Sequence, residues 1–262
     1  MIETFYTIPG LPLRRLAVVA DLHNRPCGEV LDSLRERRPQ LIAIPGDLVR
    51  SEQPDNRELV TLTQENVLPF LRSCAALAPT FYSLGNHEWM LCEKDLALLR
   101  STGAVLLDSA FAALTLNGRR ILVGGLTSVA VTSCRVHRHN LGPDAPRYPI
   151  KNRYYHFRNP RRYWLQRYEA QPGYHILLSH HPEYYPIHLA HRPIELILSG
   201  HAHGGQWRVF GKGVYCPGQG LFPPLTAGVV DDRLVISRGL ANNGWIPRLN
   251  NPPELVYVEG EG

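Results

Sequence analysis

Short apolar runs that stop abruptly at polar or glycine-rich residues recur along the chain. The runs are rich in valine, isoleucine or leucine, which is typical of strands that are buried on both faces. They are Leu16–Ala20, Leu41–Ile44, Thr80–Leu84, Ile121–Val123, His175–Leu178 and Ile194–Leu198. The pattern therefore predicts a set of short buried strands, each followed by a polar loop.

Amphipathic stretches between the early runs predict helices. Helical periodicity covers Gly28–Arg38, Arg57–Ala78 and Glu93–Ser101, and we expect an interruption of the second stretch near Pro69. Strands and helices alternate in the first half of the chain, whereas the second half has more strands and longer loops. This order favours the α/β class, with two mixed β-sheets packed together and flanked by helices in a four-layer α-β-β-α sandwich.

The chain has 262 residues, which is long enough for one large domain, and no linker-like segment divides it. We therefore expect a single domain over residues 1–262. One segment, at about residues 133–166, breaks the rhythm of strands and helices because it is basic, aromatic and rich in proline. Loops of this length are usually functional or disordered, so we interpret this segment as an insertion near the functional site.

The positive charge of the chain is concentrated in that segment. Between Ser133 and Tyr168 there are nine basic residues and one acidic residue, a net +8, so the rest of the chain carries −3 of the total +5. Such a concentration favours an anionic partner, either a phosphate ester, an acidic membrane surface or nucleic acid. A solvated basic loop is the alternative interpretation.

The cysteines and the N-terminal residues bear on the compartment. The five cysteines are widely spaced and form no C-x-x-C pair, which argues against a disulfide framework and favours a reducing environment. Arg14 and Arg15 precede an apolar run of only about five residues, unlike a secretory signal, and no stretch reaches the roughly 18 apolar residues of a membrane span. We expect a cytoplasmic protein, with peripheral membrane contact left open.

Five polar clusters follow the predicted strands, and the first two carry aspartates. Asp21 and His23 point to the same side of an extended chain, so a carboxylate and an imidazole can grip one divalent ion. Asp47 follows Gly46, which permits a sharp turn at the end of the next strand. Each cluster alone is common and non-specific.

The other three clusters add an amide and several imidazoles. Asn86 offers a neutral oxygen and His87 a proton donor or base, although Asn86 also suits a helix N-cap. His180 and His181 stand together after another strand. His201 and His203 lie on one side of an extended chain and are flanked by glycines, which makes this the most specific single cluster.

The clusters together predict a metal centre. All of them supply oxygen or nitrogen ligands without thiolate, a mixture that suits Mn, Fe or Zn rather than Ca or a structural zinc. The set is too large for one ion and fits two ions that share a carboxylate. The candidate ligands are Asp21, His23, Asp47, Asn86, His180, His201 and His203.

The order of these motifs resembles that of the calcineurin-like metallophosphoesterases. The family pattern is D-x-H, G-D, G-N-H-E/D, a later His and G-H-x-H, and here it appears as D-L-H at 21–23, G-D at 46–47, G-N-H-E at 85–88, His180 and G-H-A-H at 200–203. The resemblance implies the calcineurin-like phosphoesterase fold and a binuclear metal-dependent phosphoesterase. It also implies two divalent ions, for which manganese is favoured over iron and zinc.

The resemblance implies a role for each ligand. Asp21, His23 and His203 would hold one metal ion, and Asn86, His180 and His201 the other. Asp47 would bridge both ions, and a hydroxide shared by the metals would attack phosphorus in line. His87 would lie outside the metal shell, where it can protonate the leaving group.

Further motifs narrow the resemblance. G-H-A-H-G-G-Q at 200–206, with S-R-G-L at 237–240 and N-P-P-E at 251–254, is similar to the bacterial branch that includes UDP-2,3-diacylglucosamine hydrolases and envelope phosphodiesterases. In the phosphoprotein phosphatase branch, the third residue after the bridging aspartate is another aspartate, whereas here it is Arg50, which can contact a phosphate oxygen. His181 is either a substrate contact or a structural residue.

We therefore expect a phosphodiesterase or pyrophosphohydrolase acting on a small molecule, which the basic aromatic segment would allow to be lipid-linked. A nuclease using the same site is the first alternative, because basic residues interleaved with aromatics also suit single-stranded nucleic acid. A non-catalytic metal-binding scaffold on the same fold is the second alternative. No protein partner is expected.

Overall fold

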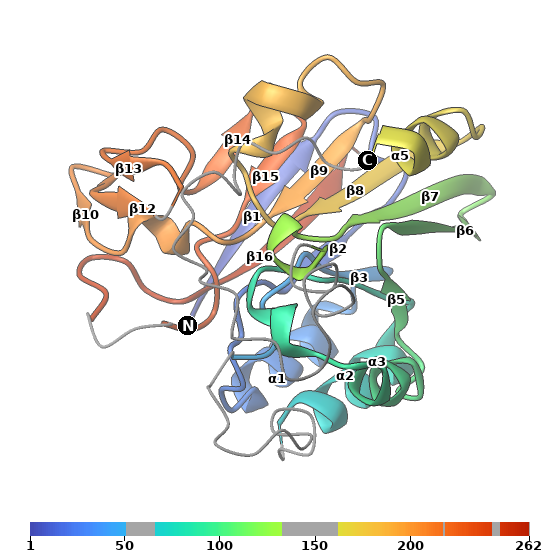
Figure 1. The fold of residues 1–262 in the computed structure, drawn as a ribbon, viewed down its shortest axis with the longest axis horizontal. Coiled ribbons are helices and arrows are strands. Elements are labelled where there is room, and N and C mark those ends of the chain that lie inside the picture. Colours follow the sequence, from blue (N-terminus) through green and yellow to red (C-terminus); the bar gives the residue numbers. More distant parts are fainter. Residues whose placement is uncertain (51–65, 133–161, 217, 243–246, 262) are drawn as a thin grey trace, which may run out of the picture.

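A computed structural model describes residues 1–50, 66–132, 162–216, 218–242 and 247–261. Its framework is two six-stranded sheets packed face to face with helices on both outer sides (Figure 1). The first sheet has the order β1 (Ile2–Ile8), β16 (Glu254–Gly260), β2 (Leu16–Val18), β3 (Leu41–Ile44), β4 (Thr80–Ser83) and β5 (Val105–Leu107). The second has the order β14 (Gly228–Val230), β15 (Leu234–Ile236), β9 (Leu196–Ser199), β8 (Tyr174–Ser179), β7 (Arg119–Leu126) and β6 (Ala110–Leu116).

The helices lie outside these sheets. The first sheet is covered by α1 (Gly28–Arg37), α2 (Val67–Leu77) and α3 (Glu93–Arg100), and the second by α5 (Arg162–Glu169) and the π-helical turn η3 (Tyr185–Leu189). Two 3-10 turns, η1 (His87–Met90) and η4 (His203–Gly205), follow β4 and β9. Two small hairpins, β10 (Arg208–Val209) with β11 (Lys212–Gly213) and β12 (Tyr215–Cys216) with β13 (Gly220–Leu221), stand apart from both sheets (Figure 1).

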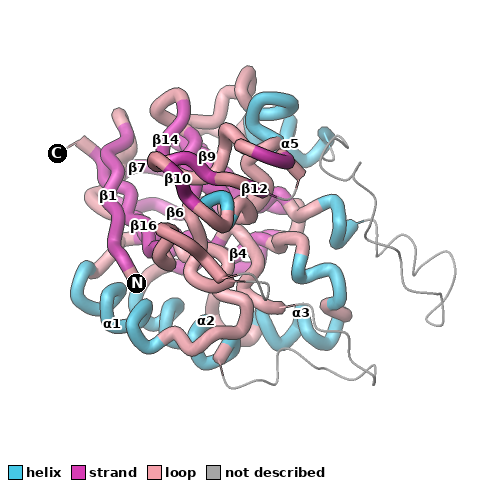
Figure 2. Tube along the Cα trace, turned by 90° about the vertical axis from the view of Figure 1, so that its left-hand side faces the viewer, coloured by secondary structure: helices cyan, strands magenta, loops and turns pink. Residues whose placement is uncertain are grey.

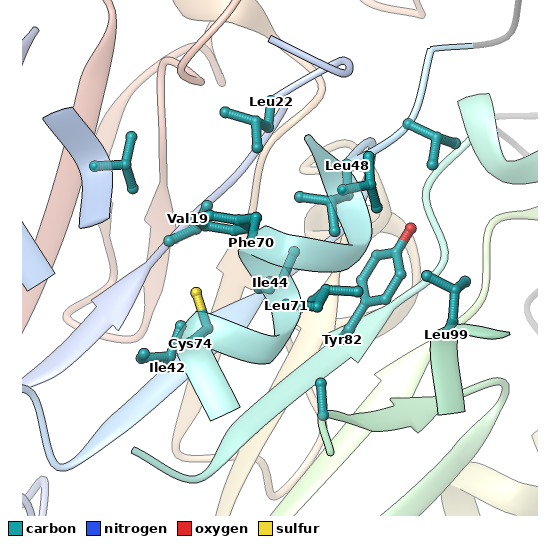
Figure 3. Packing of buried hydrophobic residues seen from close by; sticks show 14 of the residues in the cluster. Val19, Leu22, Ile42, Ile44, Leu48, Phe70, Leu71, Cys74, Tyr82 and Leu99 are labelled. Carbon is teal, nitrogen blue, oxygen red and sulfur yellow. The ribbon is translucent and has the colours of Figure 1, made fainter. Parts of the chain in front are cut away.

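The central strands are apolar throughout because both of their faces are buried. In β2, Leu16 and Val18 face the core between the two sheets, whereas Ala17 faces the core between the first sheet and its helices. The helix-side core contains Phe70 and Cys74 of α2 packed over the strands (Figure 3). Burial of each large apolar side chain contributes about 1.5–3 kcal/mol, so these strands are placed by packing on both sides.

Strand direction brings the functional loops to one region. Strands β2, β3, β4 and β5 run parallel, and β7, β8, β9 and β15 also run parallel. In each group the loops after the strands therefore leave from the same edge. This arrangement confirms the predicted α/β fold with two mixed sheets and flanking helices.

Several details differ from the sequence-based expectations. Within the described residues, α2 is not interrupted at Pro69, because this proline is the third residue of the helix, where its missing N–H has no intrahelical partner to lose. The predicted helical residues 57–65 lie outside the described ranges, as does the segment 133–161 of the expected insertion. Residues 162–166 begin α5. The single-domain organisation stays a prediction.

No helix within the described ranges combines the length and the apolar character needed to span a bilayer.

Candidate metal centre

The loops after the central strands bring the predicted ligands together. Asp21, Asp47 and Asn86 follow β2, β3 and β4 of the first sheet, while His180 and His201 follow β8 and β9 of the second. The side chains form linked groups whose ligand atoms lie within 4.8 Å of one another. These groups are Asp21–His23–His203, His23–Asp47–His87, Asp47–His180–His201 and His181–Glu183–His201.

The first group directs two imidazole nitrogens at one another. His23 Nε2 lies 3.3 Å from His203 Nε2, and Asp21 Oδ1 lies 3.7 Å from His203 Nε2. The other ring nitrogens face backbone carbonyls, His23 Nδ1 at 3.3 Å from the oxygen of Val49 and His203 Nδ1 at 3.1 Å from that of Ala241. Arg248 Nη2 also lies 3.1 Å from His203 Nδ1. In the tautomer in which Nδ1 of each ring donates to these carbonyls, both Nε2 lone pairs face the same point beside the Asp21 carboxylate.

This geometry fits a divalent cation. Two lone pairs at this distance repel one another, whereas ligands held about 2.0–2.1 Å from one ion lie about 3.0–3.4 Å apart. Burial lowers the pKa of His23 well below its ordinary value and also lowers the pKa of His203. Both rings are therefore held as neutral imidazoles, the form that binds metals.

The second group centres on His180. Its Nε2 lies 3.1 Å from Asp47 Oδ2 and 3.0 Å from Asn86 Oδ1, and His201 completes the group. Burial opposes a charge on His180, but the Asp47 carboxylate outweighs it and raises the pKa of His180 to about 9. A cation bound between these side chains would stabilise the negative charge of Asp47, which is the charge that favours the proton on His180.

Asp47 lies between the two groups. Its side chain is buried, and Oδ2 lies 4.0 Å from Nε2 of both His23 and His87, as well as close to His180. Burial opposes ionisation of this carboxyl, but the surrounding imidazoles, His180 foremost, hold the pKa of Asp47 well below its ordinary range. The charged carboxylate of Asp47 therefore faces candidate metal ligands of both groups.

The backbone at the candidate ligands is strained. Left-handed φ values are uncommon for residues other than glycine and cost about 1–3 kcal/mol each, so they persist only where the surroundings enforce them. Five candidate ligands have such values: Asp21 (54°), His23 (48°), Asp47 (52°), His201 (65°) and His203 (46°). The fold therefore tolerates a loss of stability at these residues, and the strained backbone sets the direction of their side chains.

A buried glutamate holds the Asp47 loop. The Glu88 carboxylate accepts hydrogen bonds from the backbone N–H groups of Asp47, Leu48 and Val49 at 3.1, 2.9 and 3.2 Å. The Tyr82 hydroxyl donates a fourth bond at 2.7 Å. Burial, together with the nearby Asp47, raises the pKa of Glu88, whereas the four donors stabilise its charged form, so we treat the side chain as a carboxylate. This role of Glu88 was not predicted from the sequence, although an acidic residue so close after a buried strand was a signal for it.

A second buried carboxylate, also missed, lies behind the histidines. Glu183 Oε1 lies 3.5 Å from His181 Nδ1 and 3.7 Å from His201 Nε2. A carboxylate in this position orients a metal-binding histidine and increases its basicity. His181, considered above as a substrate contact, is itself buried, with Nε2 at 2.8 Å from Ser128 Oγ.

His87 and Arg50 border the centre on one side. The backbone N–H of His87 donates to Asp47 Oδ1 at 2.8 Å, and the imidazole retains 16 % side-chain exposure. Burial lowers the pKa of His87, and the charge of Arg50 contributes a smaller effect in the same direction. The His87 ring is thus placed beside the candidate ligands but open to solvent on one edge.

Glycines pack against the aspartates, and Gly200 allows a direct prediction. A Cβ atom at Gly200 would lie 2.5 Å from Asp21 Oδ2 and 2.9 Å from Ala20 Cβ, so Gly200→Ala should displace the Asp21 carboxylate. Because small displacements in an active site have large effects, we expect roughly a hundredfold loss of activity and weaker metal retention. Turnover and metal content measured side by side check this expectation.

The matched control is Gly28→Ala, because a Cβ atom at Gly28 meets nothing within 4 Å and neither glycine has a left-handed φ. This variant should keep both activity and metal. Wild-type activity in Gly200→Ala would show that the Asp21 position is not tightly constrained.

Comparisons with known proteins bear on this arrangement. The sequence profile of a family described as "Calcineurin-like phosphoesterase" matches residues 14–205. The chain is 25 % identical over 252 residues to the uncharacterized protein YpbG of Bacillus subtilis (strain 168). This alignment covers 95 % of this chain and 82 % of the relative.

Two solved structures share the fold. A dimetal phosphatase from Danio rerio superposes with a TM-score of 0.51 at 13 % identity, covering 87 % of this chain and 88 % of that one. A putative 5'-nucleotidase from Staphylococcus aureus in complex with alpha-ketoglutarate superposes with a TM-score of 0.50 at 14 % identity, covering 95 % of this chain and 55 % of that one. At these identities the likeness is one of fold.

Proposed function

The chain belongs to the calcineurin-like phosphoesterase family, and from this premise we propose that this metal-dependent phosphoester hydrolase acts on phosphodiesters or pyrophosphates of small molecules. The observation that carries the proposal is the position of Asp47 between two groups of metal-binding side chains. A shared carboxylate suits two ions placed side by side, the arrangement that supports direct hydrolysis of phosphate esters.

Our assignment of ligands follows the two groups. Asp21, His23 and His203 would hold one ion, and Asn86, His180 and His201 the other, with Asp47 shared. This donor set suits Mn, Fe or Zn, and we favour manganese because oxygen donors accompany the imidazoles. When bound, the two ions would polarise the phosphoryl oxygens and lower the pKa of water at the site to about 7.

The residues beside the centre would handle the leaving group. His87 Nε2 lies 4.0 Å from Asp47 Oδ2, and the charge of Asp47 favours the protonated ring against the effect of burial, so this imidazole, when protonated, would donate to the departing oxygen. Arg50, whose charge acts on His87, would bind a non-bridging phosphate oxygen. Arg50 stands where the phosphoprotein phosphatase branch has an aspartate. This difference supports a diester or pyrophosphate substrate over a phosphoprotein.

The motifs at 200–206, 237–240 and 251–254 support membership of the UDP-2,3-diacylglucosamine hydrolase-like branch.

The test compares a diester with a monoester. Purified protein with added manganese should hydrolyse bis-p-nitrophenyl phosphate faster than p-nitrophenyl phosphate. A chelator should stop turnover and manganese should restore it, because all of the proposed chemistry depends on the ions. The release of p-nitrophenol measures both reactions.

The control is Asp21→Asn prepared in parallel. Its side chain keeps an oxygen that accepts from the backbone N–H of His201 but loses the charge beside His203. Activity that persists in this variant would arise elsewhere, and a marked preference for the monoester would replace the diesterase proposal with a phosphatase.

A further inference from the structure

The exposed apolar side chains gather around the two small hairpins. Thirteen large hydrophobic residues are exposed among the described residues, and seven of them belong to this region. We call these seven the hairpin patch: Trp207, Val209, Phe210, Tyr215, Leu221, Phe222 and Leu249. Phe210, in the turn between β10 and β11, is fully exposed, and Leu221 at the end of β13 and Phe222 just after it are 71 % and 75 % exposed.

These side chains are held outward by an ordered backbone. Phe210 and Phe222 have left-handed φ values of 50° and 49°, which are strained for bulky residues. The surrounding loop is well bonded, since the N–H of Phe222 donates to the Val214 carbonyl at 2.8 Å and the Gln219 side chain bonds both backbone groups of Leu225. The strained backbone at Phe210 and Phe222 holds both aromatic rings exposed. This favours a role for the two rings in contact with another surface.

The charge of the region indicates what that surface is. Between residues 204 and 230 the chain has no acidic residue, and its two charged residues are Arg208 and Lys212. Exposed aromatic and aliphatic side chains accompanied only by positive charge are typical of segments that enter the interface of an anionic bilayer. The partner that fits this chemistry is an anionic lipid surface.

The shape of the region agrees with insertion between lipid headgroups. The hairpins project from the outer end of the sandwich in Figure 1, and they lie toward the viewer when that side is turned to the front in Figure 2. Their apolar residues come from both hairpins, with Val209 in β10, Tyr215 in β12 and Leu221 in β13. A stable protein interface buries about 800 Å² on each partner, which a flat surface provides more readily than projecting tips.

The hairpins are also joined to the candidate metal centre. Asn251 Nδ2 donates to the carbonyl of His203 at 2.7 Å and to the carbonyl of Gln206 at 3.1 Å, and Gln206 lies just before β10. Arg208 Nη1 donates to the Gly204 carbonyl at 2.9 Å, within the η4 turn that contains His203. Contact of the hairpin patch with a bilayer would therefore place the centre close to the lipid surface.

We propose that the hairpin patch docks the protein on an anionic lipid bilayer. This proposal stands on the exposed side chains and the charge of the patch, and it does not depend on the identity of the substrate.

Vesicle co-sedimentation tests the docking. Wild-type protein should bind vesicles of equal parts phosphatidylglycerol and phosphatidylcholine, and should bind pure phosphatidylcholine vesicles less. The double variant Phe210→Ser/Phe222→Ser should lose binding by roughly tenfold or more, because each buried ring contributes strongly. Hydrolysis of soluble bis-p-nitrophenyl phosphate should stay unchanged in this variant.

The matched control is Ile187→Ser, which removes a 45 % exposed hydrophobic residue on η3, outside the patch. It should bind vesicles like the wild type. Equal binding by the double variant, or no binding by the wild type, would overturn the docking proposal. Light scattering that gives a dimer for the wild type and a monomer for the double variant, without vesicle binding, would overturn it in favour of an interface between two copies.

Discussion

Replacing Asp47 by asparagine is expected to abolish hydrolysis and to reduce the metal content. The carboxylate faces His23, His87 and His180, so its charge serves both groups of proposed ligands. Asparagine keeps an oxygen that accepts the backbone N–H of His87, which should preserve the fold. Loss of transition-state stabilisation worth several kcal/mol predicts roughly a thousandfold lower turnover.

Metal analysis and bis-p-nitrophenyl phosphate turnover, measured on the same preparation, check this prediction. The matched control is Asp32→Asn on α1, where the carboxylate is exposed and accepts from Arg35 at 2.8 Å. The control should retain both properties, since exposed ion pairs contribute little. Full metal content in Asp47→Asn would contradict the assignment of Asp47 as a shared ligand.

Replacing Glu88 by glutamine should destabilise the fold as well as the site. Three backbone N–H groups and the Tyr82 hydroxyl donate to the buried carboxylate, and an amide offers one acceptor oxygen and two N–H donors that would face other donors. Unsatisfied buried donors predict a loss of about 3 kcal/mol or more, and for a chain of this size a fall in Tm of roughly 6–12 °C. Activity should fall too, since the Asp47 loop loses its support.

Thermal unfolding followed by circular dichroism measures this effect. Tyr82→Phe removes a single donor and should cost about 1 kcal/mol, so it gives a graded comparison. Glu93→Gln on α3, where the carboxylate is exposed, is the matched control and should melt like the wild type. A Glu88→Gln variant with wild-type Tm would mean that the loop does not depend on this carboxylate.

The sequence predicted the strands β2 to β4 and β7 to β9, but it missed the inner strands β15 and β16 as well as the outer strands. The expected run Leu41–Ile44 coincides with β3 because both of its faces are buried and the apolar run has no gaps. In contrast, β1 and β6 were not predicted, because they are partly exposed and mix polar with apolar residues. Such strands depend on partners far along the chain, which periodicity within a short window does not detect.

The same distinction applies to the site. The candidate ligands belong to short motifs, so residue types and spacing were sufficient to propose them. Glu183 and Gly239 contact these ligands across the fold, and nothing in their own sequence neighbourhood reveals the target. Gly239 illustrates this, since a Cβ atom there would lie 2.7 Å from Asp21, a residue of a different strand and a distant part of the sequence.

The position of β16 has a consequence for synthesis of the protein. This strand, near the end of the chain, pairs with β1 on one side and with β2 on the other, and β2 leads directly to Asp21. Strand β1 must therefore wait until residues 254–260 have been synthesised before it has a neighbour in the sheet. Contacts of such long sequence separation form slowly, so the centre should assemble only after β16 has been synthesised. A nascent chain lacking β16 would expose an unpaired sheet edge to chaperones rather than bind metal.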